Sequence, residues 1–291
     1  MSYPAINAVT RERGSYWKLR LSSGWLILPA MMFVVAFFII PLLVMVERSL
    51  FDPSPENYSR FFESSVYPRA MFFTLWMAAL VTALCLALGF PYAYLTYRLA
   101  GTWQWVLIVL VLLPFWSSLL VRTYAWTILL RDSGLINWAL IGTGLIDRPV
   151  KLMGNTLGIV VGMTHVLLPF MVLPIIAAMR RFDENLFLAA SGLGAPPLTA
   201  FWRIFFPLCL PGVLAGCLLV FVLAVGFYIT PAILGGRTAF FSLLIVMQVN
   251  KLLDFGFGSA LGVILLLVVL AAVALGSRLV RLETLFDQGQ K

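Results

Sequence analysis

The chain has 291 residues, of which 62% are hydrophobic and only 11% are charged, and its mean hydropathy is +1.00. So few charged residues cannot cover the surface of a water-soluble protein of this length, which excludes that class. The formal net charge of +8 does not indicate nucleic-acid binding, because the basic residues are scattered near the ends of apolar runs and form no basic face.

Six apolar runs without a charged residue follow one another along the chain. Each has at least 23 residues, and a helix needs about 20 to cross the hydrocarbon core of a bilayer. We therefore predict an all-α membrane protein with six transmembrane helices, at 24–46, 70–97, 99–121, 152–179, 204–236 and 255–277. The first run is too long for a cleavable signal peptide, so we expect a permanent helix. The 13 residues 238–250 are too few to span, and we expect an interfacial or re-entrant piece there.

The polar ends of the chain and the loops predict its orientation. We expect a basic N-terminal leader at 1–23, one transmembrane domain at 24–282 and a short tail at 283–291. With six helices both termini share one side of the membrane, and that side carries eleven Lys and Arg residues against nine on the other. Because basic loops tend to stay in the cytoplasm, we place both termini there.

The longer external segment at 122–151 holds the first candidate functional residues. Its first part is expected to continue the third helix and then to bend along the membrane surface. Arg122, Tyr124 and Trp126 suit an interfacial depth. Two interpretations stay open: these residues anchor the helix at the interface, or they form a gate or a contact for an external partner.

Other candidates lie within the apolar runs. Tyr228, Thr230 and Pro231 combine polar groups with a helix break in the fifth run, so they either line a pathway or serve packing. His165 is the only histidine, and no carboxylate accompanies it in its run. We expect it to be a hydrogen-bonded structural residue rather than a proton relay. The three cysteines match no disulfide or zinc spacing, so we expect no metal or cofactor on this chain.

The triplet Asp254-Phe255-Gly256 also occurs in protein kinases. The chain has neither a kinase catalytic loop nor a phosphate-binding G-x-x-x-x-G-K-[ST] sequence. We interpret the triplet as a coincidence at the start of the sixth helix. For the same reason we expect the chain to have no ATPase activity of its own.

Residues 180–207 interrupt the apolar chain between the fourth and fifth predicted helices. Their five charged residues would oppose membrane insertion by on the order of 12 kcal/mol, so we expect this stretch in the cytoplasm. A short helix is predicted at 184–193, with Asp183 as its N-cap and Gly194 at its end. A second short amphipathic element at 198–206 returns the chain to the membrane. The many small residues let another protein's surface approach closely, which favours a docking element.

The sequence LAASGLGAPPLTAFWRIFFP at 188–207 resembles the EAA motif of the membrane subunits of ATP-binding-cassette importers. The matching positions are Ala189, Ala190, Gly194, Phe201, Ile204 and Pro207. Leu188 stands where the motif has its acidic residue and Phe206 where it has Leu. Glu184, one turn earlier, is a candidate substitute for that acid.

This resemblance extends over residues 24–282 and implies the type I importer permease fold. The coupling segment would then be 183–207, between the fourth and fifth helices. In this family its helix sits in a cleft of a cytosolic ATPase and transmits the closure of that ATPase to the gate.

Two further blocks, at 113–140 and 226–236, resemble the subfamily that handles spermidine and putrescine, whose related members take up opines, aminoethylphosphonate and other small organic ions. Phe227 stands where polyamine permeases often carry an acidic residue. The resemblance implies a bacterial cytoplasmic (inner) membrane location. It also implies a second, different permease subunit, two copies of a cytosolic ATPase that bind ATP and Mg²⁺, and a periplasmic or extracellular substrate-binding protein. Membrane lipid surrounds such a chain, and no nucleic acid is expected.

Two other classes of protein compete with this interpretation. A secondary transporter or channel driven by an ion gradient commonly uses carboxylates buried in its helices, and this sequence has none well inside a predicted helix and no evident inverted repeat. A membrane-embedded enzyme would need clustered His, Asp or Cys residues. Dependence of uptake on ATP rather than on a proton gradient separates the importer from the secondary transporter.

Overall fold

Helices make up all the regular secondary structure in the part of the chain that the structure describes, residues 27–52, 56–236 and 238–288. The structure is a computed structural model, and it describes side chains as far as residue 278. The predicted leader at 1–23 and its basic residues, Arg237 and the end of the predicted tail lie outside the described residues. The elements are η1 (Val35–Ile39), α2 (Ile40–Phe51), α3 (Asn57–Glu63), α4 (Val66–Arg98), α5 (Thr102–Leu112), η2 (Leu113–Trp116), α6 (Leu119–Leu130), α7 (Leu135–Gly142), α8 (Thr156–Met179), α9 (Asn185–Gly192), α10 (Pro197–Ala200), η3 (Phe201–Phe205), α11 (Phe206–Val225), α12 (Ile229–Leu234), α13 (Phe241–Asn250) and α14 (Phe255–Gln288).

The described helices agree with the predicted membrane class. Five are long and apolar enough to cross a bilayer: Ile27–Phe51, Val66–Arg98, Thr156–Met179, Pro197–Val225 and Phe255–Arg278. A sixth span is counted if the bent pair Thr102–Trp116 and Leu119–Gly142 is taken as one. The 13-residue apolar run that was too short to span contains α13, a helix of 10 residues.

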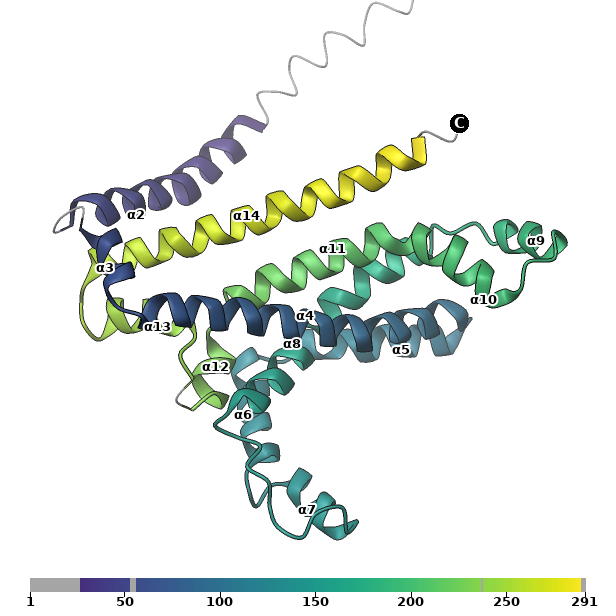
Figure 1. Cartoon of the computed structure of the whole chain (residues 1–291), viewed down its shortest axis with the longest axis horizontal. Coiled ribbons are helices and arrows are strands. Elements are labelled where there is room, and N and C mark those ends of the chain that lie inside the picture. The colour runs from purple at the N-terminus through teal and green to yellow at the C-terminus, as the bar shows by residue number, and fades with distance from the viewer. Residues whose placement is uncertain (1–26, 53–55, 237, 289–291) are drawn as a thin grey trace, which may run out of the picture.

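The third predicted helix, at 99–121, is broken near its end. The chain turns by 100° between Trp116 and Leu119. Pro114 cannot donate a backbone hydrogen bond, the helix tightens to a 3₁₀ turn there, and Ser117 and Ser118 take extended backbone angles. The bend therefore comes earlier than the sequence indicates, and α6 and α7 project from the side of the bundle (Figure 1).

The boundaries of the fifth helix also differ from the prediction. The element predicted at 198–206 is continuous with the following span, which runs from Pro197 to Val225. A π-helical turn, η3, lies within it, where the backbone N–H of Phe206 donates to the carbonyl of Phe201. Because Pro207 has no N–H to donate, one regular hydrogen bond is missing at this turn. At its other end the predicted run 204–236 breaks after Val225, and α12 begins at Ile229.

The centre of the bundle is formed by α4, α8 and α11, which bury the largest apolar cluster. Gly212 allows α11 to approach α8 closely, because a Cβ at this position would overlap the side chain of Ala178 and the carbonyl of Pro174. Such close contacts between small residues favour helix association within a membrane. In contrast, α2 packs along α14 at the edge of the bundle, and Ser49 is its one buried residue.

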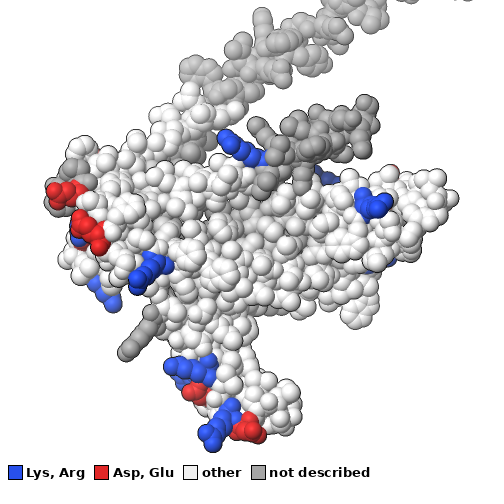
Figure 2. Space-filling view, in the orientation of Figure 1, with Lys and Arg blue, Asp and Glu red and all other residues white. Residues whose placement is uncertain are grey.

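The two ends of the bundle carry different elements. Figure 1 shows α9 and α10 at one end, where α4 and α8 finish and towards which α14 runs, while α3, α12 and α13 lie towards the opposite end. In Figure 2 the charged side chains of the visible face lie mainly at the ends of the bundle and in the projecting part of the chain, on the segments that follow α6 and α7. This distribution is typical of helices that cross a hydrocarbon layer.

Candidate functional site

Local hydrogen bonds define both ends of α9. A carboxylate oxygen of Asp183 accepts from the backbone N–H of Asn185 at 3.0 Å, which is the bond expected of an N-cap, although the helix begins at Asn185 rather than at 184. At the other end Gly194 has φ +81°. The N–H of Ala195 donates to the carbonyl of Ala190, and that of Gly194 to the carbonyl of Ser191, both at 3.0 Å. These two bonds form a Schellman motif, which ends the helix as the sequence predicts.

A cluster of aromatic rings connects α9 to the membrane-spanning helices. Phe205 of η3 is fully buried at its centre. The ring centroids around it lie 5.0 Å (Phe182), 5.5 Å (Phe201), 5.6 Å (Tyr94 and Tyr97) and 5.9 Å (Phe187) away. We call these six residues the Phe205 cluster. It joins α9 to the ends of α4 and α11 through packed side chains. Sequence reasoning singled out only Phe201, because the tyrosines lie about a hundred residues earlier in the chain.

Glu184 is exposed at the start of α9 and is bonded to α4. The hydroxyl of Tyr97 donates to a carboxylate oxygen of Glu184 at 3.2 Å. Beside this pair a cavity of about 340 Å³ opens between α9, α10 and the end of α4. Its walls include Tyr94, Phe187 and Phe201, with the charged side chains of Glu184 and Arg98.

The outer surface of the 183–207 segment combines exposed leucines with exposed polar and charged residues, among them Asp183, Glu184 and Arg203. Leu188, Leu193 and Leu198 are 70%, 90% and 70% exposed. Ala189 and Gly194 are exposed as well, whereas Ala190 is buried. Of the remaining predicted positions, Phe201 belongs to the Phe205 cluster, Ile204 is half-buried and Pro207 is exposed near the start of α11. The structure thus places Leu188, Ala189 and Gly194 on one accessible segment and Ala190 behind it.

Arg122 lies just beyond the bend in the third span and holds that bend together. Its Nη2 donates to the carbonyl of Ser117 at 2.9 Å and to the carbonyl of Pro114, and its Nε donates to the Ser117 hydroxyl at 3.3 Å. A cavity of about 250 Å³ adjoins it, with Phe170 of α8 and Phe227 among its walls. The breaks in the third and fifth spans therefore border one cavity.

Two polar contacts attach α6 to the bundle. The hydroxyls of Thr123 and Thr230, both buried, lie 3.4 Å apart and link α6 to α12. The indole N–H of Trp126 donates to Nδ1 of His165 at 3.2 Å, so the expected hydrogen-bonded histidine has a partner in α6. Pro231 is buried beside Thr230.

The other two predicted pathway residues are more accessible than these. Tyr124 on α6 is largely exposed, and Tyr228 lies partly exposed at the break before α12. The structure therefore brings four of the six predicted pathway residues, Arg122, Trp126, Thr230 and Pro231, to α6 and its contacts, and leaves both tyrosines at the surface.

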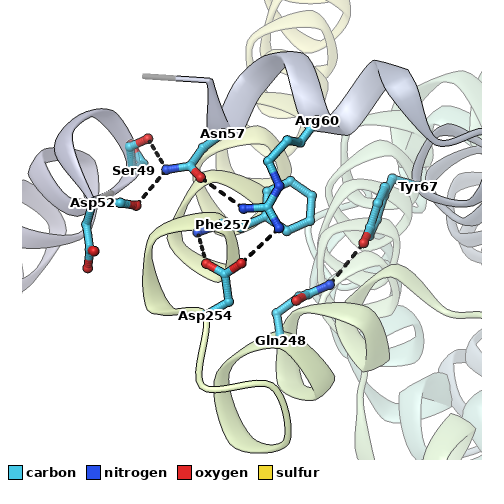
Figure 3. Close-up of polar contacts among 8 residues, drawn as sticks. All are labelled: Ser49, Asp52, Asn57, Arg60, Tyr67, Gln248, Asp254 and Phe257. Atoms are coloured by element: carbon cyan, nitrogen blue, oxygen red, sulfur yellow. Dashed lines mark hydrogen bonds and ion pairs between the residues drawn. The ribbon is translucent and has the colours of Figure 1, made fainter. Parts of the chain in front are cut away.

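A polar cluster at the opposite end of the bundle was not predicted (Figure 3). One carboxylate oxygen of Asp254 accepts from the backbone N–H of Phe257 at 3.0 Å and caps α14, which agrees with the interpretation of its triplet as a helix start. The other oxygen binds Arg60 of α3 at 2.9 Å. The Arg60 guanidinium also lies 4.3 Å from the centroid of the Phe257 ring.

The same cluster fixes the end of α2. The side-chain amide of Asn57 donates to the carbonyls of Ser49 at 3.1 Å and Asp52 at 2.8 Å. Gly256 is required here, because a Cβ at this position would overlap the Asp52 carbonyl. Figure 3 shows how these contacts join α2, α3 and the start of α14, while Gln248 of α13 donates to the Tyr67 hydroxyl of α4. Among the side chains that the structure describes, no three His, Cys, Asp or Glu come together as a metal site requires.

Known proteins resemble this chain over much of its length, although no family model matches it. The spermidine/putrescine transport system permease protein PotB of Escherichia coli strain K12 is 35% identical over 214 residues, which cover 73% of this chain and 78% of that protein. PotB of Haemophilus influenzae is 35% identical over 181 residues, 62% of this chain. That alignment spans 63% of the relative, just under two thirds of its length. The putative 2-aminoethylphosphonate transport system permease protein PhnU of Salmonella paratyphi A is 29% identical over 218 residues, 67% of this chain and 70% of that one.

The fold is shared with a solved structure. A chain of a bacterial ABC transporter that imports the acidic polysaccharide alginate superposes with a TM-score of 0.72 at 19% identity. The superposition covers 91% of this chain and 98% of that one.

Proposed function

Because this chain belongs to the family of permease subunits of ATP-binding-cassette importers, we propose that it forms part of the solute pathway and is driven through α9 by a cytosolic ATPase. The observation that carries the proposal is the Phe205 cluster, which connects an exposed apolar helix to two membrane-spanning helices. Packed aromatic side chains transmit displacement because protein interiors are dense and compress little. A shift of α9 then reaches α4 and α11 directly.

The residues of the coupling segment take distinct parts in this mechanism. Leu188, Ala189 and Gly194 form the contact with the ATPase, and Ala190 lets α9 lie close to the bundle. Phe201 carries the movement into the Phe205 cluster, and Ile204 and Pro207 continue it into α11. Glu184 ties the start of α9 to Tyr97 of α4 and is exposed, so it is also accessible to the ATPase.

The solute pathway is proposed to run past the breaks in the third and fifth spans. Helix breaks expose backbone groups that line cavities in many transporters, and the cavity beside Arg122 adjoins both breaks. Trp126, Thr230 and Pro231 hold the walls of this region in place, and Tyr124 and Tyr228 lie at its accessible edges. The relatives named for spermidine and putrescine and for 2-aminoethylphosphonate support a small organic solute of the amine, opine or phosphonate type.

The complete importer is proposed to contain a second, different permease chain, two ATPase subunits and an external binding protein. ATP and Mg²⁺ bind to the ATPases, and this chain binds neither. We place the assembly in a bacterial inner membrane with both termini and α9 in the cytoplasm. This placement is supported by the weak excess of basic residues on that side of the sequence.

Reconstitution tests the proposal against a gradient-driven transporter. The chain, its partner permease and the ATPase are purified together and placed in proteoliposomes with the binding protein outside and ATP inside. We expect uptake that requires ATP and survives a protonophore. Uptake that continues without ATP and stops with the protonophore, or a folded chain that never co-purifies with an ATPase, would show that the proposal is wrong.

A further inference from the structure

Two side chains of opposite charge line the cavity between α9 and α4 without pairing with each other. Glu184 lies at the start of α9 and Arg98 at the end of α4, and both are exposed. Among the side chains that the structure describes, an ion pair joins Arg60 to Asp254, whereas none joins Arg98 to Glu184. The cavity therefore offers both an acid and a base to a molecule that enters it.

Each of these two charged groups keeps unused hydrogen-bonding capacity. One carboxylate oxygen of Glu184 accepts from the Tyr97 hydroxyl at 3.2 Å, and a carboxylate can accept several such bonds. The Arg98 guanidinium lies 5.6 Å from the centroid of the Tyr94 ring, a contact that uses none of its N–H donors. An ammonium group can thus bind to Glu184 while a carboxylate or phosphonate group binds to the guanidinium of Arg98.

The walls of the cavity beside the two charges are aromatic. Tyr94 of α4, Phe187 of α9 and Phe201 of η3 all line it. These rings belong to the Phe205 cluster, so packing holds them in position. Aromatic faces attract ammonium groups and also cover the alkyl part of a small molecule. The cavity volume of about 340 Å³ lies in the range of binding sites for small organic molecules.

We propose that this cavity binds a small zwitterion, an organic molecule with an ammonium group for Glu184 and a carboxylate or phosphonate group for Arg98. A diamine would place its second positive charge next to Arg98, and a dicarboxylate would place its second negative charge next to Glu184. Both arrangements are repulsive, so the site selects against them. It is separate from the cavity beside Arg122, which adjoins the breaks in the third and fifth spans.

A bound zwitterion restrains the movement of α9. Its two ends contact different helices, because Glu184 lies at the start of α9 and Arg98 in α4. A ligand stabilises the arrangement to which it binds, so a filled cavity holds α9 against α4. This consequence rests on the proposed function, in which movement of α9 drives transport, and it makes the zwitterion an inhibitor. The binding itself does not depend on that function.

Isothermal titration calorimetry on the full chain in nanodiscs tests the chemistry of the site. Three probes share the same alkyl spacer: the zwitterion 5-aminopentanoate, the diamine putrescine and the dicarboxylate adipate. We expect 5-aminopentanoate to bind at least about tenfold more tightly than the other two, because each of them exchanges one ionic contact for a repulsion. Equal or tighter binding of putrescine or adipate would overturn the inference.

Variants that remove single charges locate the bound probe. Glu184→Gln and Arg98→Gln should each raise the Kd for 5-aminopentanoate about tenfold. Asp183→Asn and Arg181→Gln remove neighbouring exposed charges that do not line the cavity, and they should change the Kd less than about twofold. Equal effects of both pairs would contradict the inference. Loss of binding in Phe227→Trp, with the first pair unaffected, would place the probe in the cavity of the broken spans and also overturn it.

ATP hydrolysis separates this inference from the proposed function. In the importer assembled in nanodiscs, saturating 5-aminopentanoate should lower the rate of hydrolysis at least about twofold. The ATPase subunit alone should not respond, and Arg98→Gln should remove the response relative to its own rate without the probe. If the wild-type chain neither assembles with an ATPase nor changes its rate, the proposed function fails, and the titration still tests the site. If it assembles and binds no 5-aminopentanoate, only the binding site is wrong. An unchanged rate with the probe bound would contradict the restraint on α9.

Discussion

The rings of Phe187 in α9 and Phe205 in η3 stack with their centroids 5.9 Å apart. Phe205 also contacts two rings of α4, Tyr94 edge to face and Tyr97 at a tilt of 37°. The short helix α9 is therefore packed against the spans and is not suspended on its two connecting loops. A displacement of α9 must either move Phe205 or break these contacts.

Truncation of Phe205 tests this connection. Phe205→Ala removes the central ring of the cluster and is expected to cost about 3–5 kcal/mol of stability, as for other buried phenylalanines. We expect solute uptake to fall by at least about tenfold while the ATPase still binds, because the contact surface of α9 remains. Uptake and ATPase affinity are measured on the same proteoliposomes. The exposed Phe72 of α4 gives the control Phe72→Ala, and equal uptake by the two variants would contradict the coupling role of the cluster.

Substitutions of Gly194 test whether the end of α9 faces the ATPase. Gly194→Asp is expected to abolish uptake and ATPase coupling while the chain still inserts, because it puts a charge on the contact surface. Asn has nearly the same shape and tolerates the positive φ of +81° about as well as Asp. Gly194→Asn should therefore retain most uptake. Normal uptake by Gly194→Asp would show that this position does not face the ATPase.

We expect the ion pair between Arg60 and Asp254 to make a small but measurable contribution to the free energy of unfolding. Asp254→Asn removes the ion pair, which is partly exposed, and is expected to cost less than about 1 kcal/mol. Asp254→Ala also removes the cap on α14 and should cost about 1 kcal/mol more. Thermal unfolding in detergent compares these variants with Arg60→Ala and with the double variants. Strictly additive effects of Arg60→Ala and Asp254→Asn would mean that the two side chains do not interact.

A substitution of His165 distinguishes an importer driven by ATP from a transporter driven by protons. It accepts a hydrogen bond from Trp126, so His165→Gln, which keeps an acceptor, should retain at least about half of the ATP-dependent uptake. Trp126→Phe removes the donor and keeps an aromatic ring, and we expect it to destabilise the fold by about 1 kcal/mol. Loss of uptake in His165→Gln with an intact, folded complex would point to a proton relay.

The features read correctly from the sequence are local ones. Apolar length indicates the spans, and Gly194 ends α9 through hydrogen bonds between residues near one another in the sequence. These signals need no knowledge of distant residues. The 100° bend in the third span was placed too late, because Ser117 and Ser118 interrupt an uncharged run without changing its overall hydropathy.

The features that were missed depend on residues far apart in the chain. Tyr97 meets Glu184 across 87 positions, and Arg60 meets Asp254 across 194. A single sequence does not show which distant positions are in contact in the folded chain. For the same reason the sequence did not show that the exposed Glu184 accepts a hydrogen bond from Tyr97 of α4.

Cross-linking between α9 and the ATPase tests the central claim most directly. The native cysteines, two of them buried, are replaced by Ala, and a single cysteine is introduced at the most exposed leucine of the segment as Leu193→Cys. With a short thiol cross-linker, the account predicts an adduct with the ATPase subunit that changes in yield when ATP is added. Phe62→Cys, also exposed but at the opposite end of the bundle, should give none. No adduct at position 193 in an assembled complex, or equal adducts at both positions, would contradict the account.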